Sequence, residues 1–239
     1  FNIMSKTLNE EEILTIHQFC SRHFVNHYDV RIELVDHLSC SIESMWEKEP
    51  NISFWDALNT VYLNYGPTGF RKLMFEKEQE VAKSAQKGFK HLLFSFFYWP
   101  NIFFVFLMVL FFIFIYKTFA QFNPNIASLI IVSCVEGIIL FDIFISIYSY
   151  KKRKKMREPL LILQEPSSFT LSILFQYSVV SFIIDFHSDK SNIVAELSNP
   201  KIFFIYAFTI LLYLILALAR WQYIKGMFKK AKALYPTAF

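Results

Sequence analysis

Glycine and cysteine are scarce in this chain of 239 residues, which contains five glycines and three cysteines. So few glycines argue against a phosphate-cradling loop, and the sequence has neither a GxSxG nor an HExxH motif. Cys20, Cys40 and Cys134 form no CxxC pair, so we expect three free thiols. The sequence therefore predicts no catalytic residue, no metal and no cofactor. An enzyme would have to be a membrane-embedded one without a recognisable signature.

The first ninety residues also lack any long apolar run. Residues 1–20 carry three glutamates, Glu10 to Glu12, so we expect no cleavable signal peptide and a cytoplasmic N-terminal domain. Beyond Lys90 the composition becomes strongly apolar. We therefore predict a soluble helical domain over 1–90 and a membrane domain over 91–239.

Four apolar stretches each approach the ~20 residues that a helix needs to cross a hydrocarbon core of ~30 Å. They lie near 97–116, 126–148, 167–185 and 202–220. Their apolar residues run continuously without alternation, which favours helices over a β-barrel. The expected fold is all-α: a small cytoplasmic helical domain followed by a four-helix transmembrane bundle.

Basic residues in the flanks of these spans alternate between many and few, which predicts the orientation. The first loop has only Lys117, whereas the second carries a cluster: Lys151, Lys152, Arg153, Lys154, Lys155 and Arg157. The third loop has Lys190 and Lys201, and the tail is basic again. We expect both termini and the central loop to lie on the cytoplasmic side of a bacterial inner membrane.

The basic run Lys151–Lys155 would indicate nucleic-acid binding in a soluble protein. Directly after a span it favours an anchor on anionic lipid, so we predict membrane lipids and no nucleic acid as partners. Arg220 to Lys232 mixes aromatic and basic residues, which predicts an interfacial helix along the inner surface.

The N-terminal domain reads as four helices. Asn9 is placed to cap the first, and Ser53 with Asp56 to cap the third, which ends at Gly66-Pro67. The second helix, over 29–46, has an apolar stripe that predicts packing against its neighbours. A fourth helix begins near Thr68 and leads towards the first span.

Glu33 and His37 are spaced four apart on the second predicted helix. The pair has two metal-ligand side chains, but no second pair of similar quality follows, so a solvated face or a local hydrogen bond is favoured.

Tyr28 to Glu80 contains an acidic and apolar helix, Glu33-Leu34-Val35-Asp36-His37-Leu38, then a capped helix with Ala57-Leu58 and a Gly66-Pro67 turn. This stretch resembles the HAAS-type helical domains that precede membrane spans in many bacterial proteins. The resemblance implies a regulatory domain followed by several spans.

Glu136 lies at the midpoint of the second predicted span, where an ionisable group costs at least ~2.5 kcal/mol. Ser133 and Gly137 beside it favour a packed face, and Gln176 in the third predicted span is the expected partner. The interpretation left open is a structural hydrogen bond or a proton-responsive carboxylate. Asp142 lies nearer the cytoplasmic side, where we expect it to snorkel or to pair with Lys151 or Lys152.

The leading hypothesis is an integral inner-membrane protein whose domain over 1–90 binds a protein partner or senses a state. One alternative is a small transporter or ion-coupled subunit that uses Glu136. The other is an accessory subunit of a larger complex. Transport would require oligomerisation, since four spans supply little space for a substrate pathway.

Overall fold

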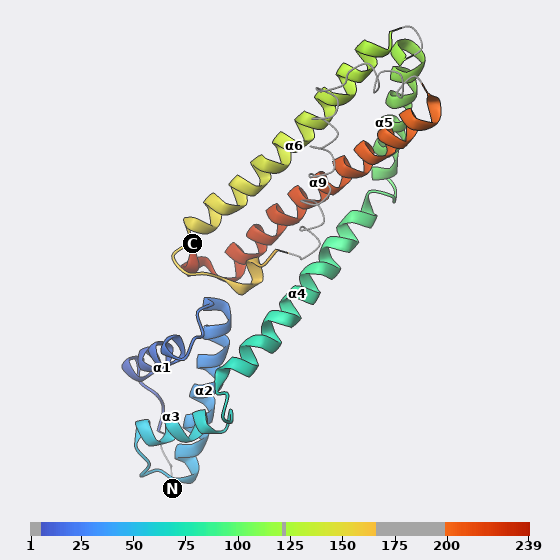
Figure 1. Cartoon of the computed structure of the whole chain (residues 1–239). Helices are drawn as coiled ribbons and strands as arrows, with labels where there is room; N and C mark the ends of the chain where they lie inside the picture. Colours follow the sequence, from blue (N-terminus) through green and yellow to red (C-terminus); the bar gives the residue numbers. More distant parts are fainter. Residues whose placement is uncertain (1–5, 121–122, 166–198) are drawn as a thin grey trace. The chain divides into compact units, whose positions relative to one another are not determined.

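The structure is a computed structural model that describes residues 6–120, 123–165 and 199–239, and its regular elements in these ranges are all helical (Figure 1). The predicted all-α fold is confirmed for this part of the chain. Two compact units divide the described residues. The head unit comprises 6–83, 155–164 and 228–239, and the span unit comprises 84–120, 123–154, 165 and 199–227. The head unit therefore includes two segments that lie far beyond residue 90 in the sequence.

Helix α1, Glu10–Arg22, begins with the predicted cap. The Asn9 side chain accepts a hydrogen bond of 2.8 Å from the Glu12 N–H, and the Glu12 carboxylate accepts one of 2.9 Å from the Asn9 N–H. These reciprocal bonds satisfy two of the N–H groups that a helix start leaves unpaired.

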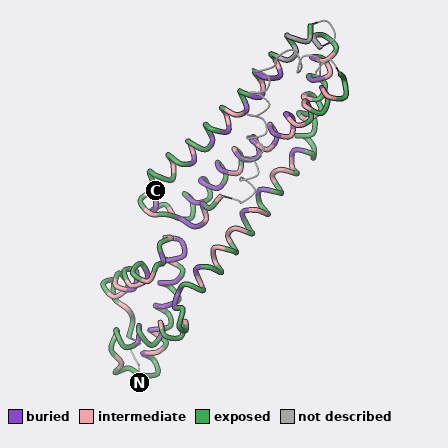
Figure 2. Tube along the Cα trace, viewed as in Figure 1, coloured by how far each residue is buried: buried purple, intermediate pink, exposed green. Residues whose placement is uncertain are grey.

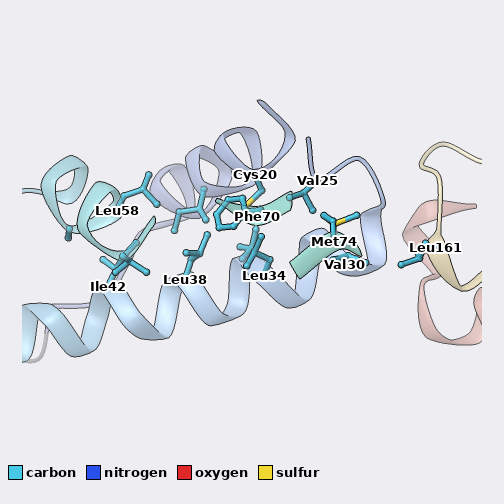
Figure 3. Close-up of a cluster of buried hydrophobic side chains, with 14 of the residues drawn as sticks. Cys20, Val25, Val30, Leu34, Leu38, Ile42, Leu58, Phe70, Met74 and Leu161 are labelled. Carbon is cyan, nitrogen blue, oxygen red and sulfur yellow. The ribbon is translucent and has the colours of Figure 1, made fainter. Parts of the chain in front are cut away.

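Helix α2, Tyr28–Lys48, carries the centre of the head-unit core, as its apolar stripe predicts. Leu34, Leu38 and Ile42 lie at helical spacing on its buried face (Figure 3). Side chains from α1, α3 and α4 pack against this face, and the core also includes Leu161 from the segment after α6. Burial of this stripe is the main source of stability for a domain of short helices.

Helix α3, Phe54–Leu63, is capped by Ser53, whose Oγ accepts from the Asp56 N–H at 3.1 Å. The turn that follows places Gly66 at φ +77° and Gly69 at φ +53°. At Gly69 a Cβ would lie 2.4 Å from the Tyr62 Oη, so no larger residue fits there without a shift of Tyr62. Helix α4, Phe70–Ser95, then runs from the head unit into the span unit.

The span unit contains α5, Asn101–Ile115, the π-helical turn η1, Tyr116–Ala120, and the long helices α6, Pro124–Lys154, and α9, Pro200–Leu234. Three helical stretches are long and apolar enough to cross a membrane: Asn101–Thr118, Leu129–Lys154 and Pro200–Leu234. They match three of the four predicted spans. The span predicted at 167–185 lies outside the described residues.

The directions of these helices follow from their contacts. The Tyr116 ring, at the end of α5, lies 5.0 Å from the ring of Phe203, near the start of α9. The Trp221 ring, late in α9, lies 5.1 Å from that of Tyr148, late in α6. Thus α6 and α9 are parallel, as Figure 1 shows, and α5 is antiparallel to α9. Much of the surface of α5 and α6 is exposed and apolar, as a lipid-facing surface would be (Figure 2).

Two helices are longer than predicted. Helix α6 continues through Lys151–Lys154, so these residues form its last turn and not a loop. Their positive charges stabilise the partial negative charge at the C-terminal end of the helix. Helix α9 is continuous to Leu234, so Arg220–Lys232 are helical as predicted but form the last turns of the same helix, and their place along the inner surface stays a prediction. Polar residues that reach water do not end a helix, because Lys, Arg and Gln all have good helix propensity.

Candidate functional site

The span unit contains a buried ion pair that joins α6 to α9. Arg220 donates from Nη1 to Asp142 Oδ1 at 2.8 Å, and the two side chains are only 9% and 3% exposed. Two charges are tolerated in such a place when each neutralises the other. This pair therefore fixes the register of α6 against α9.

Further polar groups extend the pair into a network. Arg220 Nη2 donates to Ser146 Oγ at 3.1 Å and lies 3.5 Å from Glu165 Oε2. Glu165 accepts from Ser149 Oγ at 2.9 Å and forms an ion pair with Arg153. We call these six residues the charge network: Asp142, Ser146, Ser149, Arg153, Glu165 and Arg220. Its two carboxylates balance its two guanidinium groups.

Asp142 binds Arg220, where we expected Lys151 or Lys152. At 100° per residue, Lys151 lies on the face of α6 opposite Asp142. By contrast, Ser146, Ser149 and Arg153 follow Asp142 at intervals of three or four and share its face. This polar stripe was visible in the sequence. Its partner Arg220 looked like one more basic residue of the tail, and only its position within the long helix α9 distinguishes it.

Glu136 is exposed, as are Ser133 and Gly137 beside it. Its expected partner, Gln176, lies outside the described residues, so that hydrogen bond stays a prediction. Glu136 is not part of the charge network.

The basic residues at the end of α6 have different environments. Arg153 belongs to the charge network, and Lys152 donates to Tyr148 Oη at 3.2 Å. The remaining four, Lys151, Lys154, Lys155 and Arg157, have exposed side chains. They stay candidates for contact with lipid head groups.

A second polar site lies within the head unit, at the first turn of α2. The Asp29 carboxylate accepts hydrogen bonds from the backbone N–H groups of Leu161, at 2.9 Å, and Ile162, at 2.8 Å. These N–H groups begin the 3₁₀ turn η2, Leu161–Leu163, and have no partner within such a turn. Asp29 is only 9% exposed, so these charge-assisted bonds are shielded from water.

Neighbours of Asp29 hold the residues just before η2. Tyr28 donates its backbone N–H to the Pro159 carbonyl at 2.8 Å, and Arg31 forms an ion pair of 2.9 Å with Glu158. Residues 158–165 will be called the strap. Its first part is bonded to the head unit, and its last residue, Glu165, to the charge network of the span unit.

The end of the chain is bonded into the same region of the head unit. Arg157 donates its N–H to the Ala238 carbonyl at 2.9 Å, and Thr237 Oγ1 lies 3.0 Å from Tyr28 Oη. The residues that follow α6 and those that follow α9 are thus joined within one unit.

Several head-unit groups have shifted pKa values. Burial, assisted by the charge of Arg31, lowers the pKa of His17, while Glu158 acts in the opposite direction. Burial raises the pKa of the Cys20 thiol to about 12, so this buried thiol is not nucleophilic at neutral pH. The hydrogen bond to Glu33 raises the pKa of Lys77. Glu33 therefore has an ion-pair partner on α4, 2.7 Å away.

In the ranges that the structure describes, no three His, Cys, Asp or Glu side chains gather as a metal site would require. The three cysteines are free thiols, as expected.

No family model matches the chain, and the searches of curated proteins and of solved structures found no match either.

Proposed function

We propose that this multi-pass membrane protein is a signal-coupling protein, in which the head unit is a cytoplasmic regulatory or partner-binding domain. The observation that carries the proposal is the strap. Within eight residues it passes from Asp29 and Arg31 of the head unit to Arg220 and Arg153 of the span unit. A partner that displaces the first turn of α2 would pull on Glu165 through this segment.

Buried polar contacts make the strap suited to two discrete states. A carboxylate that caps two N–H groups is either bonded or released, and releasing it leaves buried donors that cost roughly 1–3 kcal/mol each. Such an energy gap is the size that binding of a partner supplies. The resemblance of Tyr28 to Glu80 to HAAS-type domains agrees with this role and forms part of the proposal.

The proposed topology has four spans with both termini in the cytoplasm. Glu165 lies beside Arg220, whereas Pro200 begins α9. At a rise of about 1.5 Å per residue, the helix from Pro200 to Arg220 is about 30 Å long, which is the thickness of a hydrocarbon core. This separation of the two described ends supports the return crossing predicted at 167–185.

The coupling is tested in the full chain, purified in detergent, by replacing Asp29 with Asn. The amide side chain keeps the shape but removes the charge and one acceptor. We expect faster hydrogen exchange at the Leu161 and Ile162 amides. Asp36→Asn is the matched control, because it removes an exposed carboxylate from the same helix.

Movement in the span unit is then measured between spin labels at two exposed positions, Tyr150 on α6 and Gln222 on α9. Cys40 and Cys134 are first replaced, and buried Cys20 is left in place. Asp29→Asn should broaden or shift the distance distribution. If the strap amides exchange faster while this distribution stays that of the wild type, the head unit is an anchor and does not couple to the spans.

The rival transporter hypothesis depends on Glu136. Replacing Glu136 with Gln keeps the side chain's hydrogen bonding and removes its ability to ionise. If the hypothesis holds, Glu136→Gln should therefore lose ion-coupled flux into proteoliposomes. An accessory subunit would instead co-purify in mild detergent with membrane proteins at fixed stoichiometry, in the wild type and in Asp29→Asn alike. A regulated partner would be lost from the Asp29→Asn sample only.

A further inference from the structure

Two lysines and an aromatic pair repeat one another across α6 and α9 at the end of the spans. Tyr148 is followed four residues later by Lys152, and Trp221 is followed four residues later by Lys225. The Tyr148 and Trp221 rings lie 5.1 Å apart. The Lys152 ammonium lies 5.4 Å from the Tyr148 ring, and the Lys225 ammonium 5.1 Å from the Trp221 ring.

The two helices are parallel, so both lysines lie one turn beyond the ring pair in the same direction. Two ammonium groups thus lie at the same level along the helix axes, one turn closer to the helix C-termini than the two neighbouring aromatic rings. Tyr and Trp prefer the level of lipid head groups, and lysines at helix ends extend towards phosphates. The level is therefore that of the membrane interface.

Apolar side chains continue the same face towards the hydrocarbon core. The Phe144 ring lies 5.8 Å from that of Trp221 and is 52% exposed, and the Phe141 ring lies 6.2 Å from it. This face lies away from Asp142 and Ser149, which are buried. This face consequently presents two cations towards the C-terminal ends of α6 and α9 and aromatic surface on the preceding turns.

We propose that this face is a binding site for one anionic phospholipid. Lys152 and Lys225 bind the phosphate, Tyr148 and Trp221 pack beside the glycerol region, and the acyl chains lie along Phe144 and Phe141. Charge complementarity selects an anionic over a zwitterionic lipid, since two ammonium groups face one head group. The exposed Phe144 ring and the partly buried rings beside it supply apolar contact to acyl chains, which a soluble phosphate lacks. This site is independent of the proposed coupling through the strap.

The test is native mass spectrometry of the full chain with added phosphatidylglycerol or phosphatidylcholine. The wild type should retain one phosphatidylglycerol in preference to phosphatidylcholine. The double variant Lys152→Gln/Lys225→Gln should weaken phosphatidylglycerol binding by at least about tenfold, given the energy of two lysines near a lipid surface. Glycerol phosphate should not displace the lipid.

The matched control is Lys154→Gln/Lys230→Gln, which removes the same charge from the same two helices at other faces. It should bind as the wild type does. Equal weakening in both double variants would mean general attraction to a basic surface and would overturn the site, as would displacement by glycerol phosphate or equal retention of the two lipids.

A second measurement does not depend on the folding of the lysine variants. Dibrominated phosphatidylglycerol should quench tryptophan fluorescence more than dibrominated phosphatidylcholine does, and Trp221→Phe should remove that difference. A difference that persists in Trp221→Phe places the anionic lipid elsewhere.

Discussion

At the scale of single residues, Asp142 and Arg220 each make the other's burial possible. Removing Arg220 leaves the Asp142 carboxylate buried without this counter-ion, whereas removing both side chains removes the buried carboxylate as well. The single and the double replacement are therefore predicted to differ in free energy of unfolding by more than the change in side-chain size would suggest.

We expect Arg220→Met to destabilise the span unit by about 3–5 kcal/mol, because Asp142 stays buried without its partner. The double variant Asp142→Leu/Arg220→Met should recover most of this loss. Thermal unfolding of the full chain in detergent measures both. Additive losses in the double variant would show that the pair contributes through packing alone.

His17 should give the protein a pH-dependent stability. Its pKa in the folded chain is below the ordinary value of 6.5, so as pH falls through 6.5 the unfolded chain binds a proton that the folded chain does not. The wild type should therefore lose stability relative to His17→Gln between pH 7.5 and about 5.5. Thermal unfolding of both forms across this range is the measurement, with exposed His37→Gln as the control. A wild-type to His17→Gln difference that is constant with pH would contradict the prediction.

At the scale of elements, α2 organises the head unit by its buried stripe. Leu38 is fully buried and Leu14, on α1, is 57% exposed. We expect Leu38→Ala to cost about 2–5 kcal/mol and Leu14→Ala less than about 0.5 kcal/mol. Hydrogen exchange of α1 and α3 in the full chain reports the loss. Similar exchange in the two variants would argue against this core.

The elements also show what a sequence can and cannot predict. Asn9 and Ser53 cap helices that begin at the next residue, so the signal and its effect are local and were predictable. Asp29 caps a turn 132 residues later, and Glu165 binds Arg220 55 residues later. Neither residue carries a local pattern that names a distant partner. The apolar run Leu160 to Leu163, which follows the charged stretch 151–158, was the available sign that this connection is packed and not a free loop.

At the scale of the whole molecule, the topology can be read with reporter fusions. We expect fusions after residue 90, within 151–157 and at the C-terminus to report cytoplasm, and one within 187–195 to report the exterior. Neutralising Lys151 to Lys155 should weaken this orientation. An exterior signal at 151–157 would reverse the proposed sidedness, and equal signals at 151–157 and 187–195 would remove the span predicted at 167–185.

The composition of the head unit from three separated segments bears on how the protein is made. A ribosome releases the first four helices long before Leu161, and Ala238 emerges after both. The bonds that Asp29 and Arg157 make must therefore wait until the intervening helices have been made. Until then, the Asp29 carboxylate and part of the core remain open to water and to chaperones. Completion of the head unit thus depends on α5, α6 and α9 having been made, so a copy that lacks α9 cannot complete its head unit.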